Sequence, residues 1–316
     1  MTASRRPHIS VISPVYQAQD CVAELCRRIR IAVENMPGDH EIILVDDGST
    51  DGSWDEISRE SARGDVVGLR LAGNVGQHRA ITAGMDCARG EWVVVLDCDL
   101  QDPPELIPDL YRRALKGPEQ IVAARFNQRA ETYSRQRMSA LFWRFLTWLS
   151  GMDFDPRVGN YRIMSRTVVD NFVQYREQTR LLGAITLLMG FKVAHVPVTR
   201  DPRFAGETSY SRRKLLSAAL GMAFAYSDKP LRMATWVGLL LAVLSVLAAV
   251  AVLVVWAASG IQSPGWTSIM LSMYFLGGVV IAVLGITGIY VGRTFDETKQ
   301  RPLYVVGETV GFPGGA

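Results

Sequence analysis

Two long apolar segments without a charged residue limit what this chain can fold into. Residues 234–257 and 268–292 contain no Asp, Glu, Lys or Arg. As helices that rise about 1.5 Å per residue, both are long enough to cross a hydrocarbon core of about 30 Å. The alternative, a pair of buried helices in a soluble core, is weaker because such helices seldom exceed about 20 residues without a charge. The sequence therefore predicts a C-terminal transmembrane hairpin of two helices.

Basic residues flank this hairpin on one side only. Arg212, Arg213, Lys214, Lys229 and Arg232 precede the first segment, and Arg293, Lys299 and Arg301 follow the second. The connection over 258–267 has no charge. Because Lys and Arg concentrate in cytoplasmic loops, we expect both termini in the cytoplasm, beside the anionic lipid of the inner (plasma) membrane. The expected division is a cytoplasmic domain over 1–228, the multi-pass hairpin over 229–293 and a cytoplasmic tail over 294–316.

Composition narrows the class of the soluble part. A chain of 316 residues with 48% hydrophobic residues can bury at least one full core. Residues 1–10 have arginines but no apolar run, so we expect no signal peptide. The four cysteines lack the pairwise spacing of a metal site, and a cytosolic domain keeps them reduced. The net charge of +3 gives no indication of a nucleic-acid partner.

Strand-like and helical patterns alternate through the first part of the chain. Apolar runs predict strands at 9–13, 41–45, 66–71, 93–96 and 120–124, and the intervening segments predict helices at 21–35, from Ser53, at 79–88 and at 105–115. Ser53 and Glu56 have the spacing of a capping box for the second of these helices. Alternation at this spacing predicts an α/β domain with a mostly parallel sheet, covered by helices on both faces.

The fourth predicted strand ends in a dense group of polar side chains. Asp97, Asp99 and Gln101 come directly after it, before two prolines that force a new element to begin. Open α/β sheets bind ligands at the carboxyl ends of their strands, where these side chains would lie. Their oxygens could hold one hard divalent cation, with a diphosphate completing its shell. The alternative is a turn that uses Asp and Pro only as breakers of the strand.

The second predicted strand also ends in paired aspartates, Asp46 and Asp47. If the two strands are near neighbours, their carboxylates converge on one crevice. The sequence contains no P-loop and no Gly-x-Gly-x-x-Gly cradle. The phosphates of a bound nucleotide would therefore be held by a metal ion and by basic side chains.

Eight short motifs follow one another along the chain. They are Ser13-Pro-Val-Tyr16, Glu41-Ile-Ile-Leu-Val-Asp-Asp-Gly-Ser-Thr-Asp-Gly52, Asn74-Val-Gly-Gln77, Thr82-Ala-Gly-Met-Asp86, Leu96-Asp-Cys-Asp-Leu-Gln-Asp-Pro-Pro-Glu-Leu-Ile-Pro108, Val158-Gly-Asn-Tyr-Arg162, Arg203-Phe-Ala-Gly-Glu-Thr208 and Arg301-Pro-Leu-Tyr304. Together they resemble family 2 glycosyltransferases and, within that family, the polyprenyl-phosphate glycosyltransferases, similar to bactoprenol glucosyltransferases and dolichol-phosphate mannose synthases. The resemblance covers nearly the whole chain and implies a GT-A fold, a Rossmann-like nucleotide-diphospho-sugar transferase domain.

The resemblance also implies roles for individual residues. It places nucleotide-sugar binding at Pro14, Tyr16, Val45, Asp47, Asp97, Cys98, Arg125 and Arg203. It places Mg²⁺ or Mn²⁺ at Asp97, Asp99 and Gln101, catalysis at Asp97, Asp99, Asn160 and Arg162, and the acceptor phosphate at Arg162, Arg203, Ser209 and Lys214. The planar fork of arginine suits phosphate oxygens, although a single arginine taken alone is more often a solvated surface charge.

Four positions depart from the pattern of this branch. Gln17 and Ala18 stand where the branch has Asn and Glu, which removes one polar contact to the nucleotide. Asn160 replaces a carboxylate that is sometimes assigned to catalysis, and Ser209 replaces a lysine whose role Arg212, Arg213 or Lys214 would take over. Losing the carboxylate at Asn160 need not abolish transfer, because a lipid monophosphate is already mostly an anion at neutral pH.

The expected reaction is the inverting, metal-dependent transfer of one sugar, with UDP-glucose as donor and undecaprenyl phosphate as acceptor, and a flippase would use the product for cell-envelope glycan. Another sugar, such as mannose or an amino sugar, and a non-catalytic nucleotide-sugar binding protein remain the alternatives. A processive polysaccharide synthase is disfavoured because the sequence lacks a Gln-x-x-Arg-Trp motif. A transporter is disfavoured because two spans are too few for alternating access in one chain.

Two further segments mix apolar and basic residues. The mixtures over 133–152 and 211–226 suit helices that lie in a membrane interface, although an apolar helical face more often packs in a core. The second apolar segment contains five glycines, at positions 277, 278, 285, 288 and 292. Small residues allow close contact between membrane helices, so we expect tight packing within the hairpin or within a homo-oligomer.

Overall fold

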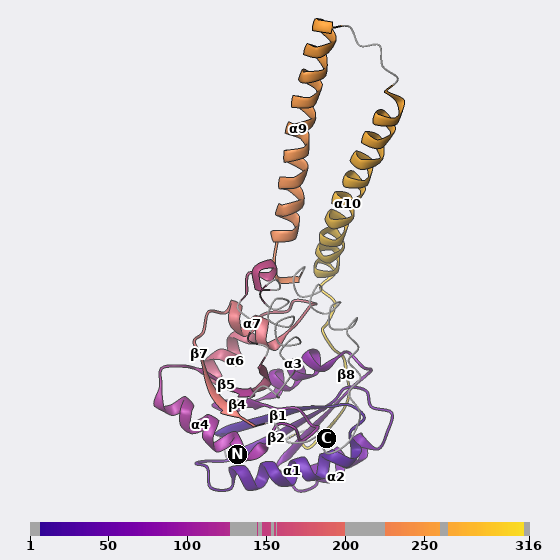
Figure 1. The fold of residues 1–316 in the computed structure, drawn as a ribbon. Coiled ribbons are helices and arrows are strands. Elements are labelled where there is room, and N and C mark those ends of the chain that lie inside the picture. Colours follow the sequence, from indigo (N-terminus) through magenta and orange to yellow (C-terminus); the bar gives the residue numbers. More distant parts are fainter. Residues whose placement is uncertain are drawn as a thin grey trace. The chain divides into compact units, whose positions relative to one another are not determined.

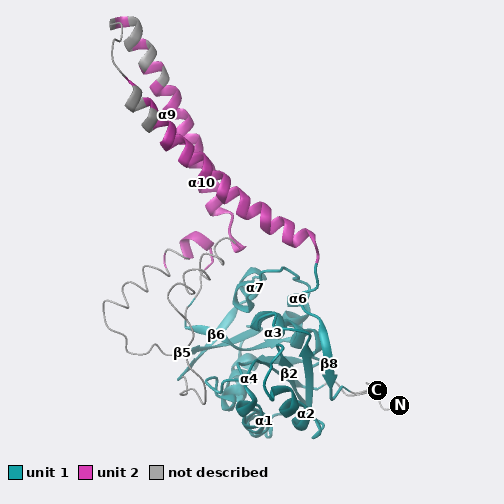
Figure 2. Cartoon of the chain, turned by 90° about the vertical axis from the view of Figure 1, so that its right-hand side faces the viewer, with its two compact units in different colours: residues 1–140, 153–209, 301–316 teal, residues 141–152, 210–300 magenta. Residues whose placement is uncertain are grey.

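The computed structural model describes residues 7–126, 144, 147–152, 155, 157–199, 225–259 and 265–312. The chain divides into two compact units, drawn in teal and magenta in Figure 2. The first comprises residues 1–140, 153–209 and 301–316, and the second comprises residues 141–152 and 210–300. The first unit contains an α/β domain, and the second contains the two long apolar helices.

The first unit is built on an eight-stranded sheet in the order β7-β5-β6-β4-β1-β2-β3-β8. The strands are β1 (Ile9–Val15), β2 (His40–Asp46), β3 (Val66–Leu71), β4 (Trp92–Val95), β5 (Ile121–Phe126), β6 (Val158–Ser165), β7 (Val193–Val198) and β8 (Val306–Val310). Only β6 and β8 run antiparallel to their neighbours in this sheet. The mostly parallel sheet expected from the sequence is therefore confirmed.

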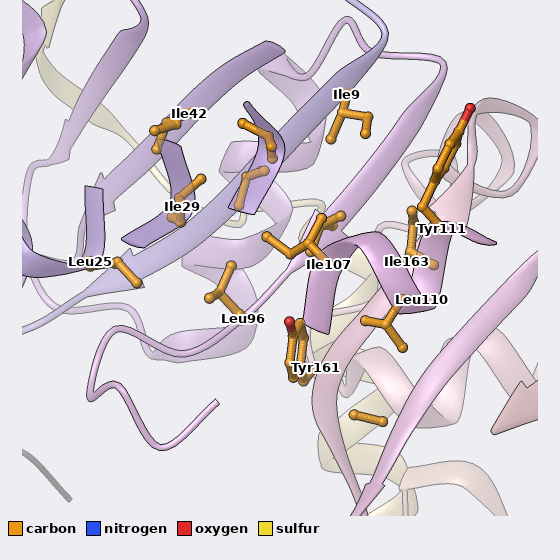
Figure 3. Packing of buried hydrophobic residues seen from close by; sticks show 14 of the residues in the cluster. Ile9, Leu25, Ile29, Ile42, Leu96, Ile107, Leu110, Tyr111, Tyr161 and Ile163 are labelled. Atoms are coloured by element: carbon orange, nitrogen blue, oxygen red, sulfur yellow. The ribbon is translucent and has the colours of Figure 1, made fainter. Parts of the chain in front are cut away.

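Helices cover both faces of the sheet (Figure 1). On one face, α1 (Gln19–Val33), α2 (Ser53–Ser61), the 3₁₀ turn η1 (Pro104–Leu106) and α4 (Ile107–Lys116) pack on one apolar cluster, part of which Figure 3 shows. On the other face, α3 (Gln77–Cys87), α6 (Arg166–Phe172) and α7 (Leu182–Leu188) pack on a second cluster. The near-continuous burial of β1, β2 and β4 is that of strands covered on both sides.

The strand register brings the two pairs of aspartates to one edge of the sheet. Strand β1 lies between β2 and β4 and runs parallel to both, with Ile12 opposite Ile43 on one side and Val95 on the other. The carboxyl ends of β2 and β4 therefore open on the same side, separated by β1. The sequence predicted a common crevice on the condition that these two strands are near neighbours, and this condition is fulfilled.

The predicted capping box at the second helix is wrong. The N-cap of α2 is Gly52, and Ser53 is already inside the helix. The buried hydroxyl of Ser53 instead accepts a hydrogen bond from the backbone N of Ala18 at 3.0 Å and donates one to Asp51 Oδ1 at 2.6 Å. This serine joins the loop after β1 to the loop after β2, which is a non-local contact that a local spacing pattern does not predict.

The residues expected as a tail, 294–316, contain the end of the helix α10 (Trp266–Thr298) and the strand β8. β8 pairs antiparallel with β3 at the edge of the sheet. Glu308 at its centre accepts hydrogen bonds from Trp54 Nε1 and Arg70 Nη1, both at 3.0 Å. Ahead of the strand, Tyr304 donates its hydroxyl to Asp86 Oδ2 at 2.6 Å. The segment that follows the last apolar helix is thus part of the α/β domain.

The second unit contains α9 (Lys229–Ser259) and α10 (Trp266–Thr298). Both are long and apolar enough to cross a membrane, judged by length and composition, over Lys229–Ala248 and Ser272–Thr298. Tyr290 of α10 donates its hydroxyl to Ser227 O at 2.7 Å, beside the start of α9. Most of 133–152 and 211–226, the expected interfacial segments, lies outside the described residues.

Candidate active site

The carboxylate of Asp97 is where three elements of the α/β domain meet. Asp97 follows β4 by two residues and is half-buried. Its Oδ1 accepts a hydrogen bond from Gln77 Nε2, at the first position of α3, at 2.6 Å. Asn160 Nδ2, from β6, lies 3.5 Å from the same oxygen. The side chains of α3 and β6 thereby orient the carboxylate that the sequence places at the centre of the site.

The three aspartates of the loop after β4 face different surroundings. Asp99 is half-buried, and its Oδ1 accepts a hydrogen bond from the backbone N of Gln101 at 3.2 Å. Asp102 is only 3% exposed, and its Oδ2 accepts from the backbone N of Asp97 at 3.2 Å. Leu100, between them, has the left-handed φ of 60° that a tight turn requires. Asp102 therefore braces the loop from inside, while Asp97 and Asp99 stand at its accessible side.

The donor set of this loop fits a divalent cation shared with a substrate. Among the described residues, no group of three or more His, Cys, Asp or Glu side chains is arranged to hold a metal ion. A full protein cage is therefore not formed by this part of the chain. Mg²⁺ is usually bound by one or two carboxylates together with substrate phosphates, and Asp97 and Asp99 supply that number. The amide oxygen of half-buried Gln101 is the further candidate ligand in the same loop.

Asp47 organises the loop that leads into α3. Its two carboxylate oxygens accept hydrogen bonds from the backbone N of Val75 at 2.7 Å and of Gly76 at 2.9 Å. Burial raises the pKa of this carboxyl, and these two backbone donors oppose the rise. Asp46, fully buried, accepts from the backbone N of Ser49 at 3.0 Å. The paired aspartates at the end of β2 thus order two loops at the edge of the sheet.

The residues expected to bind the nucleotide differ in accessibility. Pro14 and Val45 pair across β1 and β2, and both side chains are buried. Tyr16 is 46% exposed, so its ring is available for a base to stack on. The thiol of Cys98 is hydrogen-bonded by the backbone of Tyr16, and burial raises its pKa to about 12. Tyr16 is therefore the residue of this group whose side chain is best placed to touch a ligand.

Arg162 is a buried cation that holds the end of β6. It is 3% exposed and donates to Gly159 O at 2.7 Å, to Asn160 O at 3.3 Å and to Thr186 Oγ1 at 2.9 Å. Burial lowers the pKa of its guanidinium to about 10. In this conformation Arg162 fixes the backbone that carries Asn160.

Arg125, a candidate phosphate-binding arginine near the end of β5, forms an ion pair. Its Nε lies 2.7 Å from Asp155 Oδ2, and the side chain is 39% exposed. Asp155 is shared with Arg157, which donates to both of its oxygens at 2.8 and 2.9 Å. Asp155 therefore faces two cations. The other candidates for phosphate, Arg203, Ser209 and Lys214, lie outside the described residues.

The family model for glycosyl transferase family 2 matches residues 10–173 of this chain, which include Asp47, Asp97, Asp99 and Asn160. The chain belongs to glycosyl transferase family 2. Full-length relatives agree. The glycosyltransferase YkcC of Bacillus subtilis is 34% identical over 311 residues, covering 98% of this chain and 96% of that protein. The prophage bactoprenol glucosyl transferase homolog of Escherichia coli K12 is 31% identical over 300 residues, covering 94% of this chain and 98% of that protein.

The α/β unit is the GT-A domain of this glycosyltransferase, as the sequence predicted. Among solved structures, the mannosyltransferase PcManGT from Pyrobaculum calidifontis in complex with GDP-Man and Mn²⁺ is 16% identical. The alignment covers 93% of this chain and 88% of that one, with a TM-score of 0.49.

Two residues beside the aspartates of the glycosyltransferase were not singled out from the sequence. The sequence predicts a helix from residue 79, whereas α3 begins at Gln77, so the prediction leaves Gln77 and His78 outside the helix. His78 accepts a hydrogen bond from the backbone N of Leu182 at its Nδ1, 3.4 Å away. Burial and the nearby cation of Arg162 lower the pKa of His78 to about 4. The signal that could have found Gln77 is the motif Asn74-Val-Gly-Gln77, to which the resemblance gives no role, whereas His78 lies just outside that motif.

Proposed function

We propose that this glycosyltransferase transfers one glucosyl residue from UDP-glucose to undecaprenyl phosphate and inverts the anomeric carbon. The observation that carries the proposal is the 31% identity to the bactoprenol glucosyl transferase homolog of E. coli, because that alignment covers 94% of this chain and 98% of the relative. An alignment of this extent includes residues of both apolar helices as well as the GT-A domain. A lipid acceptor accounts for the helices, which transfer to a soluble acceptor would not require.

The chemistry proposed is a single displacement. An oxygen of the lipid phosphate forms a bond to the anomeric carbon, while the bond from that carbon to the β-phosphate oxygen breaks and the nucleoside diphosphate leaves with the electron pair. The second pKa of a phosphate monoester is about 6, so the nucleophile is already an anion at neutral pH. A general base is then unnecessary. This agrees with the presence of Asn160, whose amide cannot accept a proton.

The residues of the loop after β4 would hold the donor. Asp97, Asp99 and Gln101 would coordinate Mg²⁺ or Mn²⁺, whose charge neutralises that of the leaving diphosphate. The exposed ring of Tyr16 would stack on the base. Arg125, Arg203, Ser209 and Lys214 are proposed as phosphate contacts, and Arg162 would act from the protein interior by fixing Asn160. The rate then comes from positioning and electrostatic stabilisation rather than from proton transfer.

The proposed location is the inner membrane, with the GT-A domain and both termini in the cytoplasm. Basic residues lie at the start of α9 (Lys229, Arg232) and at the end of α10 (Arg293, Lys299), and the connection over 258–267 has none. This asymmetry supports cytoplasmic ends for both helices. The product would carry a polar sugar on a membrane lipid, so a flippase is the class of protein that would next consume it.

The test is transfer by the purified protein in detergent. Undecaprenyl phosphate, Mn²⁺ or Mg²⁺ and a panel of nucleotide sugars are supplied, and the lipid product is followed by mass. The expected result is one product, formed with UDP-glucose, lost on chelation and lost in Asp99→Ala. The matched control is Asp109→Ala, because Asp109 is an exposed aspartate in the first turn of α4.

Each alternative outcome has a distinct meaning. A product with another donor would keep the reaction and change the sugar. A product with the same anomeric configuration as the donor would contradict single displacement. Nucleotide binding without a product from any donor would contradict the proposed acceptor.

A further inference from the structure

Two neutral side-chain amides approach the carboxylate of Asp97. Gln77 Nε2 donates to Asp97 Oδ1 at 2.6 Å, and Asn160 Nδ2 approaches the same oxygen at 3.5 Å. The contact to Gln77 is the shorter by almost 1 Å. Gln77 therefore dominates this pair of contacts, and it belongs to neither the candidate ligands nor the candidate phosphate contacts.

The backbone around Gln77 is fixed from the other pair of aspartates. Gly76, directly before it, is the N-cap of α3 and has a φ of 94°, which a residue with a side chain rarely adopts. The backbone N of Gly76 and of Val75 donate to the two oxygens of Asp47. The end of β2 is thereby connected to the end of β4 in a continuous series of contacts: Asp47, the Val75-Gly76 backbone, the side chain of Gln77, and Asp97.

The position of α3 is also fixed beyond its first residue. Arg79 Nη2 donates to both Gln178 O at 3.0 Å and Gln178 Oε1 at 3.2 Å. His78, between Gln77 and Arg79, accepts from the backbone N of Leu182 at the start of α7. The first turn of α3 is thus attached on three sides, and Gln77 extends from a rigid backbone rather than from a loose loop.

We propose that Gln77 is a positioning residue, which fixes the carboxylate of Asp97 for a divalent cation bound together with a nucleoside diphosphate. This role rests on the proposed function, because it assumes that Asp97 is a ligand of the divalent cation. An amide suits the task because it donates a hydrogen bond without adding charge. A carboxylate at this position would repel Asp97 and compete for the cation, and an ammonium would repel the cation.

The test compares Gln77→Leu, Gln77→Glu and a matched control, Gln120→Glu. Gln120 directly precedes β5, at the amino-terminal end of that strand and away from the site, and it accepts a hydrogen bond from Ser165 Oγ. Its substitution by Glu makes the same change in charge as Gln77→Glu. Binding of Mn²⁺ in the presence of saturating UDP is measured in detergent between pH 5.5 and pH 8. Thermal unfolding of the metal-free protein is recorded over the same range.

Gln77→Leu is expected to weaken Mn²⁺ binding by about 10-fold or more at every pH, as is typical when a residue that orients a ligand is removed. Gln77→Glu is expected to bind Mn²⁺ with a much steeper pH dependence, because one of two adjacent carboxylates holds a proton that the cation must displace. Without metal, the melting temperature of Gln77→Glu is expected to fall between pH 5.5 and pH 8 relative to that of the parent. Gln120→Glu is expected to change neither the pH profile of Mn²⁺ binding nor that of the melting temperature.

Two outcomes would overturn the proposal. One is Mn²⁺ binding in Gln77→Leu and Gln77→Glu that matches Gln120→Glu at every pH. The other is a parent protein that binds no Mn²⁺ with UDP. Failure of sugar transfer alone is distinguishable from both, because neither measurement requires turnover. A protein that binds Mn²⁺ and UDP with these signatures but transfers no sugar keeps the role of Gln77 and loses the proposed reaction.

Discussion

The aspartates after β4 have two distinct environments, although they are separated by only a few residues. Asp99 is half-buried at the accessible side of the loop, and Asp102 is 3% exposed and receives the backbone N of Asp97. A ligand for a cation and a structural brace respond differently to the same substitution. Substituting Asp99 and Asp102 in turn therefore distinguishes cation binding by the loop from the stability of the loop.

Asp99→Ala is expected to reduce transfer by about 100-fold or more with an unchanged melting temperature, since it removes a proposed oxygen ligand of the cation at an accessible position. Asp102→Ala is expected to lower the free energy of unfolding by about 1.5–3 kcal/mol, because it removes a charged acceptor from a buried backbone N. The measurements are turnover and thermal unfolding of both variants. A loss of stability in Asp99→Ala equal to that in Asp102→Ala would contradict this division of roles.

His78 is expected to make the stability of the domain depend on pH. Its pKa is about 4 in the folded protein and 6.5 in an unfolded chain, so the unfolded state binds more protons between these values. Stability from the neutral ring is fully present above pH 6.5 and is lost as the pH falls toward 4. This difference in pKa between the folded and unfolded states corresponds to about 3 kcal/mol.

The measurement is the free energy of unfolding from pH 4 to pH 7.5 in the parent and in His78→Asn. The asparagine Oδ1 can take the place of Nδ1 as acceptor for the backbone N of Leu182, but it does not titrate. The variant is expected to lose that part of the pH dependence. His40→Asn, half-buried at the start of β2, is the control. Identical profiles for the parent and His78→Asn would exclude a role for this histidine.

At the scale of elements, β8 depends on glycine at its end. Gly311 has a φ of 78°, and a Cβ there would lie 2.4 Å from both Ser61 Oγ and Val66 O. Gly64 also has a positive φ, 89°, but a Cβ there would meet nothing within 4 Å. The two glycines therefore share backbone strain and differ only in the space around them.

Gly64→Ala is expected to destabilise the domain by about 1–2 kcal/mol from backbone conformation alone. Gly311→Ala is expected to cost more, because Val66 O is backbone and cannot move away without disturbing β3. Limited proteolysis should then cut within 301–312 faster in Gly311→Ala than in Gly64→Ala. Equal rates would contradict a tight fit of β8 against α2 and β3.

The central sheet was predictable because its signals are local. Each of the five predicted strands overlaps an observed strand, since a buried parallel strand has a continuous apolar run. The accessible aspartates were found for the same reason, because Asp97 directly follows such a run. Pairings between residues far apart in the chain were not found, and Arg70 with Glu308 of β8 is the clearest example.

The roles within the site follow the same rule. Asp47 was expected to touch the nucleotide, but its oxygens bind the backbone of Val75 and Gly76, 28 and 29 residues away. Gln77 is 20 residues from Asp97, and the motif Asn74-Val-Gly-Gln77 marks the residue without indicating that contact. Residue types at a strand end predict which chemistry gathers there, whereas the packing of separate loops decides which of those residues bind ligand and which support them.

At the scale of the whole chain, the α/β domain is joined to the apolar helices at both ends. The chain enters α9 after residue 228 and returns from α10 into the segment that forms β8. Because β8 is part of the domain's sheet, residues 301–312 must lie on the same side of the membrane as residues 7–126 if the helices span it. The sheet pairing therefore gives a topological constraint that is independent of the charge of the flanking residues.

Both arguments predict the same arrangement, with the connection over 258–267 on the far side of the membrane from the domain. Alkaline phosphatase inserted after residue 261, with residues 262–316 continuing beyond it, is expected to be active, since that enzyme requires the periplasm, whereas a fluorescent protein fused at the C-terminus is expected to fluoresce. Placing three lysines in the uncharged connection is expected to reduce phosphatase activity, because positive charge opposes translocation of a short loop.

Deleting 301–316 leaves the basic residues Arg293 and Lys299 in place, so the fusion after residue 261 should remain active if charge alone sets the orientation. Loss of phosphatase activity in that deletion would show that the pairing of β8 with β3, and not the flanking charge, fixes the topology.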